Sequence, residues 1–148
     1  MNVKLKQISG LAMAVVGNSG HWVTIDGPEK YGGFSAGSRP MELLLMALTS
    51  CSAMDVVSIL RKKRVKLDDF SVEVEAEQAA EHPKVFTDIK LHYILSGSNI
   101  LPADVERAIE LSENKYCSAS IMLSKSVNIN HDYTIVDPEE ESKSSSAG

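Results

Sequence analysis

The two cysteines are the residues of this chain with the widest chemical range. Cys51 lies in the middle of a predicted helix, and Cys117 follows a second predicted helix that carries Lys115 near its end. A thiolate is a nucleophile, a metal ligand and a redox group, whereas a protonated buried thiol behaves as a small apolar side chain. Both roles stay open for each cysteine, because nothing in the local sequence shows that the two sulfurs meet.

A reactive Cys51 needs a partner from another part of the fold. The dipole of a helix stabilises a thiolate only within the first turn, and Cys51 lies well beyond it. Asp55 follows one turn later on the same face. A carboxylate in that place either disfavours the thiolate or orients a cationic partner. The reactive role therefore requires a cation or a base that the fold brings to Cys51.

Residues 38–64 are predicted to form the long helix around which the chain is organised. Pro40 suits a first helical turn, and Glu42 lies where the helix dipole is positive. The cations Arg61 to Arg64 end the helix where the dipole is negative. Leu43 to Leu48 is apolar on every side, which is typical of a helix buried all round, and this run is too short to cross a membrane. We expect a second copy of the chain to supply part of the cover, in a homodimer.

The remaining sequence predicts strands around this helix and a second one. Alternating apolar residues predict strands over 70–77 and 85–93, joined by a turn and therefore antiparallel. Further strands are predicted near 3–8, 11–16, 21–25 and 127–135, and a helix from 102 to about 116. This order indicates an α+β domain over residues 1–136. Residues 137–148 are acidic and serine-rich, and we expect a flexible tail there.

Composition argues against several classes of partner. The formal net charge of -5 and the single basic run, Arg61 to Arg64, do not favour a nucleic-acid protein, and we expect no membrane partner. The N-terminal residues show no signal peptide, so we expect a cytoplasmic protein without a structural disulfide. The glycine-rich loop 31–37 lacks the spacing of a phosphate-binding loop and is interpreted as a connection.

Metal and ligand signals are weak in the sequence. The histidines fall singly and without zinc-ligand spacing to either cysteine, so no metal site is predicted; they are His21, His82, His92 and His131. Four methionines suit either core filling or the wall of a pocket for an apolar ligand, and core filling is the commoner use; they are Met41, Met46, Met54 and Met122.

Two sequence motifs resemble a known family. The first, Pro40 to Cys51 followed by Asp55-Val56-Val57, and the second, Leu111 to Ser118, together resemble the OsmC/Ohr superfamily and are most similar to its YhfA-like branch. The resemblance covers nearly everything from the first hairpin to Val136. It implies an OsmC-like fold with antiparallel sheets, a long central cysteine-bearing helix and an intertwined homodimer.

The resemblance also implies an activity. In the peroxidases of this family, a cysteine that matches Cys51 attacks a hydroperoxide and becomes a sulfenic acid, and a cysteine that matches Cys117 resolves it as a disulfide. An external thiol reductant then restores both thiols, and no cofactor is needed. The expected partners are therefore a small hydroperoxide, a thiol reductant and a second copy of the chain.

The chain departs from the family pattern where the thiolate is held. Characterised members use an arginine from the N-terminal β region and a glutamate directly after the proline. Here no arginine precedes Arg39, and Met41 separates Pro40 from Glu42. The candidates for supporting Cys51 are Glu42, Arg39, Asp55 and Lys115. The alternative function is a non-catalytic dimer that binds a small apolar or thiol-reactive ligand, or senses redox state through Cys51.

Overall fold

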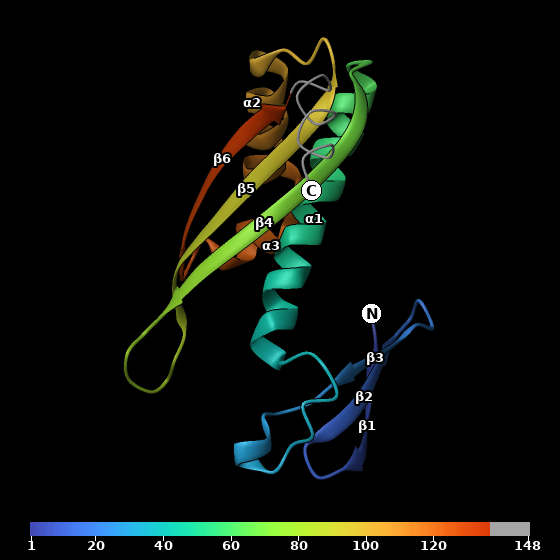
Figure 1. Cartoon of the computed structure of the whole chain (residues 1–148), viewed down its shortest axis with the longest axis vertical. Coiled ribbons are helices and arrows are strands. Elements are labelled where there is room, and N and C mark those ends of the chain that lie inside the picture. The colour runs from blue at the N-terminus through green and yellow to red at the C-terminus, as the bar shows by residue number, and fades with distance from the viewer. Residues whose placement is uncertain (137–148) are drawn as a thin grey trace, which may run out of the picture. The chain divides into compact units, whose positions relative to one another are not determined.

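The structure is a computed structural model that describes residues 1–136, and the predicted tail, residues 137–148, lies outside them (Figure 1). The chain divides into two compact units, Met1–Met46 and the residues from Ala47 onward. The boundary falls inside helix α1, Pro40–Lys62. The prediction of one continuous helix from Pro40 is confirmed, and its last turn carries Arg61 and Lys62.

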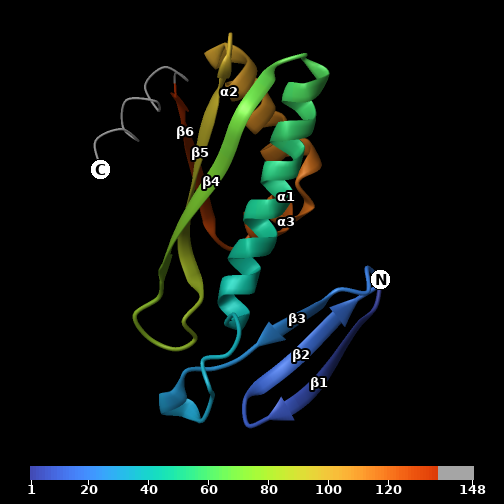
Figure 2. The ribbon, with the colours of Figure 1, turned by 45° about the vertical axis from the view of Figure 1, so that its right-hand side comes forward.

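The first unit contains an antiparallel sheet in the order β1-β2-β3 (Figure 2). The strands are β1 Val3–Ser9, β2 Ala12–Gly17 and β3 Trp22–Ile25. The predicted hairpin is confirmed, since Val16 pairs with Trp22 across the turn. Gly20 adopts a φ of 80° in this turn, a backbone conformation that suits glycine because it has no Cβ.

A buried carboxylate organises the loop after β3. The Asp26 side chain is 2% exposed and accepts backbone N–H bonds from Gly27 at 2.7 Å, Phe34 at 2.9 Å and Ala36 at 3.1 Å. The loop closes so tightly that a Cβ on Gly33 would lie 2.0 Å from the Gly27 carbonyl oxygen. Burial raises the pKa of Asp26, but the three N–H donors lower it by more, so the net pKa is below its ordinary value. The glycine-rich loop is thus wrapped around an internal anion.

The second unit contains a mixed sheet in the order β4-β5-β6. Its strands are β4 Lys66–Gln78, β5 Phe86–Ser98 and β6 Asn128–Val136. The antiparallel pairing of β4 with β5 confirms the prediction. The prediction of antiparallel sheets is wrong for β6, which runs parallel to β5. The reason is the helical crossover between β5 and β6, which returns the chain to the same end of the sheet before β6 begins.

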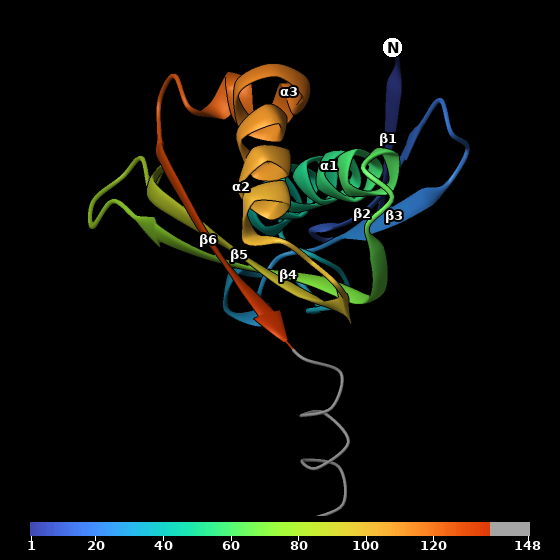
Figure 3. The same ribbon diagram turned by 90° about the horizontal axis from the view of Figure 1, so that it is seen from above.

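The helices of this unit lie on one face of the β4-β5-β6 sheet (Figure 3). They are α1, α2 Pro102–Leu111 and α3 Ser118–Leu123. Alternate residues of β5 are buried on the inner face, as the pattern predicts, and they are Ile89, Leu91, Tyr93 and Leu95. Apolar residues of α1 and α2 pack in the same core; they are Leu48, Val56 and Leu60 from α1, and Val105, Ala108 and Ile109 from α2. Charged residues occupy the outer face, where Lys90 forms an ion pair with Asp132 at 2.7 Å.

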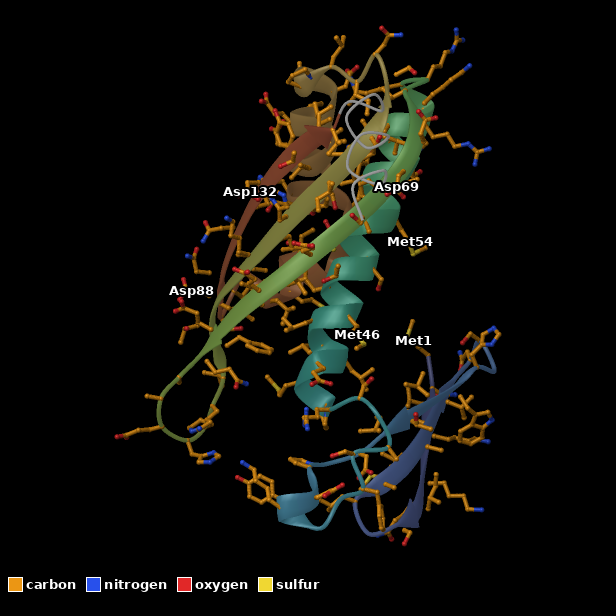
Figure 4. All side chains as sticks on the ribbon, in the orientation of Figure 1. Met1, Met46, Met54, Asp69, Asp88 and Asp132 are labelled. Carbon is orange, nitrogen blue, oxygen red and sulfur yellow. The ribbon has the colours of Figure 1, made fainter. Side chains whose placement is uncertain are left out.

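Only one stripe of α1 is buried within the described chain, so the predicted burial on every side would require the second copy of the chain. Its buried residues follow helical spacing and are Leu48, Ser52, Val56, Ile59 and Leu60. Met54 is 73% exposed and points outward from the helix (Figure 4). A single sheet covers a single side of a helix, which leaves the other apolar residues uncovered.

The apolar run 43–48 is too short to cross a membrane, as expected, but the whole of α1 is longer. With 23 residues, α1 is long and apolar enough to cross a membrane by length and composition, although no membrane is implied by that alone. Core helices of globular domains meet the same criterion. Here 28% of the apolar window is buried within the chain.

We predict that Asp26→Asn loosens the loop that follows β3. The amide has one oxygen in place of two, so it cannot accept from Gly27 at one oxygen and from Phe34 and Ala36 at the other, and the loss of the negative charge weakens the bonds that remain. Hydrogen exchange read by NMR should show the backbone amides of Phe34 and Ala36 exchanging about 10-fold faster or more. Asp68→Asn, a change to an exposed aspartate on β4, is the control. Unchanged protection of Phe34 and Ala36 in Asp26→Asn would contradict the role given to Asp26.

Candidate functional site

The structure brings both cysteines and one carboxylate together in the second unit. The Sγ atoms of Cys51 and Cys117 and a carboxylate oxygen of Asp55 all lie within 4.8 Å of one another, and both cysteines are free thiols. Cys51 and Asp55 come from successive turns of α1, as their spacing predicts. Cys117 comes from the segment between α2 and α3 and completes the cluster.

A π-helical turn places Cys117. The turn covers Ser112–Tyr116 and continues α2, and its closing bond runs from the Cys117 N–H to the Ser112 carbonyl at 2.8 Å. Cys117 then leaves the helical conformation and caps α3, because its Sγ accepts the Ser120 N–H at 3.3 Å. The sequence analysis extends the second helix to about residue 116 and predicts neither the π-turn nor α3. Short π-turns inside α-helices are frequent at functional sites.

An ion pair ties the π-turn to the edge strand β6. Glu113, in the turn, accepts a hydrogen bond from His131 on β6. This bond to Glu113 raises the pKa of His131 above its ordinary value, although burial acts in the opposite direction. The π-turn that precedes Cys117 is therefore attached to β6 as well as to α2.

A chain of buried hydroxyl groups supports Asp55. The Tyr93 hydroxyl lies 2.5 Å from Ser52 Oγ, which lies 3.1 Å from Ser112 Oγ, and Ser112 Oγ donates to Asp55 at 3.4 Å. Ser52 and Ser112 are 2% and 0% exposed. Burial raises the pKa of Tyr93 to about 12, so its hydroxyl keeps its proton. The chain joins β5, α1 and the π-turn beside the two sulfurs.

These hydroxyl residues were not predicted from the sequence. The signal available in the sequence was Ser52, a small polar residue at an inward position of an apolar helix directly after Cys51. A buried polar side chain needs a hydrogen-bond partner, so such a residue indicates a second polar group nearby. The identity of that group, Tyr93, depends on how the strand packs on the helix.

The environment of Cys117 keeps this residue protonated. Its pKa is raised to about 11, chiefly by burial; Cys51 and Asp55 contribute to the increase, and the Ser120 N–H opposes it. Cys117 is fully buried, whereas Cys51 is partly exposed. The two sulfurs therefore differ in access, and a reagent from solvent meets Cys51 first.

Three of the four predicted supporting residues have other partners within the described chain. The Arg39 backbone N–H and guanidinium bind Glu42 at 2.9 and 3.2 Å, and the N–H bond is the main reason that the pKa of Glu42 is lowered. These contacts make Glu42 a capping carboxylate of the first turn of α1. The Lys115 Nζ lies 5.4 Å from the centroid of the Tyr116 ring. The fourth, Asp55, lies in the cysteine cluster.

Comparisons with known proteins agree on one family. The sequence model described as "OsmC-like protein" matches residues 32–132. "Protein YhfA" of Escherichia coli (strain K12) is 44% identical over 136 residues, which are 92% of this chain and 98% of that protein.

Solved structures agree with this match. The crystal structure of a hypothetical protein from Aquifex aeolicus VF5 is 30% identical, with a TM-score of 0.81 over 92% of this chain and 96% of that one. A Legionella pneumophila structure described as an organic hydroperoxide resistance protein OsmC is 17% identical, with a TM-score of 0.67 over 90% of this chain and 97% of that one. At that identity the second likeness concerns the fold.

We predict that a small alkylating reagent modifies Cys51 before Cys117. In the native reduced protein, iodoacetamide should react with Cys51 about 10-fold faster or more, because Cys117 is buried and protonated. Peptide mass spectrometry over time measures both rates. Cys117→Ser should keep the fast phase and Cys51→Ser the slow one. Equal rates, or a faster Cys117, would contradict the difference in access.

Proposed function

The chain belongs to the family of OsmC-like proteins, and from this membership we propose that it is a cysteine-based reductase of organic hydroperoxides that acts in the response to peroxide stress. Proteins with the same fold include those described as organic hydroperoxide resistance proteins. The observation that carries the proposal is the position of the two free sulfurs, within 4.8 Å of each other and of Asp55.

In the first proposed step, Cys51 is the peroxidatic residue. Its sulfur attacks the terminal oxygen of the hydroperoxide, the O–O bond breaks, and the products are a Cys51 sulfenic acid and an alcohol. The sulfur is oxidised and the peroxide is reduced by two electrons. The proton of the thiol ends on the alkoxide that leaves. The partial exposure of Cys51 gives the peroxide access to this sulfur.

In the second proposed step, Cys117 is the resolving residue. Its sulfur attacks the Cys51 sulfenic acid, a disulfide forms, and the hydroxyl group leaves as water after taking the Cys117 proton. Two thiols from an external reductant then return both cysteines to the reduced state. Burial protects Cys117 from direct oxidation, and its position beside Cys51 favours trapping of the sulfenic acid before a second peroxide reacts.

Asp55 is the proposed carrier of the protons in both steps. Its carboxylate lies within 4.8 Å of both sulfurs and accepts a hydrogen bond from the Ser112 hydroxyl. A base near a nucleophile accepts its proton as attack proceeds and returns it to the leaving group. In this chain Asp55 would take the place of the arginine that supports the thiolate in other family members, because Arg39 is bound to Glu42.

The alternative function, a non-catalytic binder or redox sensor, is favoured by a separate observation. The two candidate cations of the sequence analysis are engaged elsewhere, Arg39 with Glu42 and Lys115 over the Tyr116 ring. If Asp55 does not activate Cys51, the same dithiol oxidises slowly and reports redox state without turnover. The rate of peroxide consumption separates these two functions.

We predict that the reduced protein consumes cumene hydroperoxide with loss of both thiols. About one equivalent of peroxide should give a Cys51–Cys117 crosslinked peptide in mass spectrometry, and excess thiol reductant should sustain turnover. Cys51→Ser should lower turnover by about 100-fold or more, because it removes the nucleophile. Cys117→Ser, the matched variant, should keep the first step and accumulate a Cys51 sulfenic acid that dimedone traps.

Two outcomes would reject the catalytic proposal. One is a reduced protein whose two thiols still react with an alkylating reagent minutes after the peroxide is added. The other is equal peroxide consumption by the parent and by Cys51→Ser. Either would leave the binding or sensing function as the better account of the cluster.

We also propose that the chain functions as a homodimer through α1. Apolar residues remain exposed along this helix in the described chain, and they include Leu44, Met46, Met54 and Val57. None of the four methionines fills the core within the described chain, since all four are exposed to solvent there. Exposed apolar surface of this kind indicates an interface. The location in the cytoplasm and the absence of nucleic-acid and membrane partners stay predictions.

We predict a solution mass of twice the 16.1 kDa chain at micromolar concentration. Light scattering after size exclusion measures it. Met54→Glu and Val57→Glu should shift the population toward the monomer, because each places a charge in the proposed apolar contact. Leu101→Glu, a change to another exposed leucine outside α1, is the control and should leave the mass unchanged. A monomeric parent would overturn the proposal.

A further inference from the structure

The donor set at Cys51, Asp55 and Cys117 matches the chemistry of a metal site. Two sulfurs and a carboxylate oxygen lie within 4.8 Å of one another, and donors on one zinc ion, at about 2.0–2.3 Å from it, are separated by less than this. The three donor atoms are therefore already close to the separations that one shared ion requires. Among the described residues, these three are the metal-ligating side chains that lie close enough together to share one ion.

From this juxtaposition we propose that the reduced protein binds one zinc ion through Cys51, Cys117 and Asp55. The proposal goes beyond peroxide reduction and does not depend on it, because it requires only the two thiols in the reduced state. Binding forms two Zn–S bonds and one Zn–O bond, and the two thiol protons pass to solvent. No electrons are transferred in this step.

The groups around the three donors are those that support metal ligands in proteins. Ser112 Oγ donates to Asp55 at 3.4 Å and is itself held by Ser52 Oγ at 3.1 Å. The Ser120 N–H donates to Cys117 Sγ at 3.3 Å. Such outer hydrogen bonds fix the orientation of ligands and contribute about 10–100-fold to metal affinity. Two of the three donors thus have a hydrogen-bonded support on separate elements, the π-turn and α3.

The ligand types select the class of metal. Two thiolates favour a soft or borderline ion such as zinc over magnesium or calcium, which prefer oxygen donors. Three protein ligands leave the fourth position of a tetrahedral ion open, as in exchangeable rather than structural zinc sites. Cys51 and Asp55 are partly exposed, so a water molecule or a small ligand has access to that position.

Zinc binding and disulfide formation exclude each other, because they use the same two sulfurs. An ion bound to both thiolates blocks attack of Cys51 on a peroxide, and oxidation to the disulfide removes two of the three ligands. The site would therefore release zinc when the dithiol is oxidised. This gives the cluster a second chemistry, reversible masking of the thiols by a thiophilic cation.

The test is a metal titration of the metal-free full chain, kept reduced with a phosphine. Cobalt(II) serves as the spectroscopic probe, and zinc affinity is measured by competition with a chromophoric chelator. We expect one equivalent of cobalt, with sulfur-to-metal charge-transfer absorption and the visible bands of tetrahedral coordination. Asp55→Asn should weaken zinc binding by about 10-fold or more. Asp69→Asn, an exposed aspartate on β4, should bind like the parent.

The proposal fails if Asp55→Asn or Cys117→Ser binds zinc as tightly as the parent, or if the cobalt spectrum lacks thiolate bands. A measurement without any variant guards against misfolding: the parent oxidised to its disulfide should no longer bind stoichiometric zinc, and retained binding would overturn the site. Peroxide consumption is measured separately on chelator-treated protein. Loss of that activity with zinc binding intact would reject the proposed function alone, and the reverse result would reject the zinc site alone.

Discussion

The hydrogen-bonded chain from Tyr93 through Ser52 and Ser112 to Asp55 is the interaction on which the second unit depends. It joins the middle strand of a sheet, the long helix and the π-turn at one buried point. Polar groups in an apolar core must satisfy one another, so this chain fixes how α1 rotates against β5. That rotation turns Cys51 and Asp55 toward Cys117. The packing of the core and the chemistry of the site are therefore set by the same contacts.

The parallel β5–β6 pair has a consequence for the site. Because β6 must begin at the same end of the sheet as β5, the chain between them returns across the sheet through α2, the π-turn and α3. Cys117 lies at the break between two helical segments on that return path. A simple antiparallel connection would be a short turn without such a break. The mixed topology thus supplies the second sulfur.

The long helix divides its residues between two tasks. One stripe, including Leu48 and Val56, belongs to the core, and the partly exposed Cys51 and Asp55 lie beside it. The remaining apolar residues, with Met54 the most exposed of them, stay uncovered in the described chain. Contiguous exposed apolar side chains of this kind mark a site of interaction. The helix therefore links the site to the proposed association of two chains.

The sequence by itself determined the long helix, most of the strands, the family and the two cysteines. Helical spacing placed Asp55 beside Cys51, alternation identified β4 and β5, and motifs of local residues carried the resemblance. These features depend on neighbours within a few positions along the chain, which a sequence shows directly. The parallel direction of β6, the π-turn and the hydroxyl chain to Tyr93 were decided only by the tertiary structure. The paired residues of β5 and β6 are 40 positions apart, and Ser52 and Tyr93 are 41 positions apart, and local pattern carries no record of such contacts.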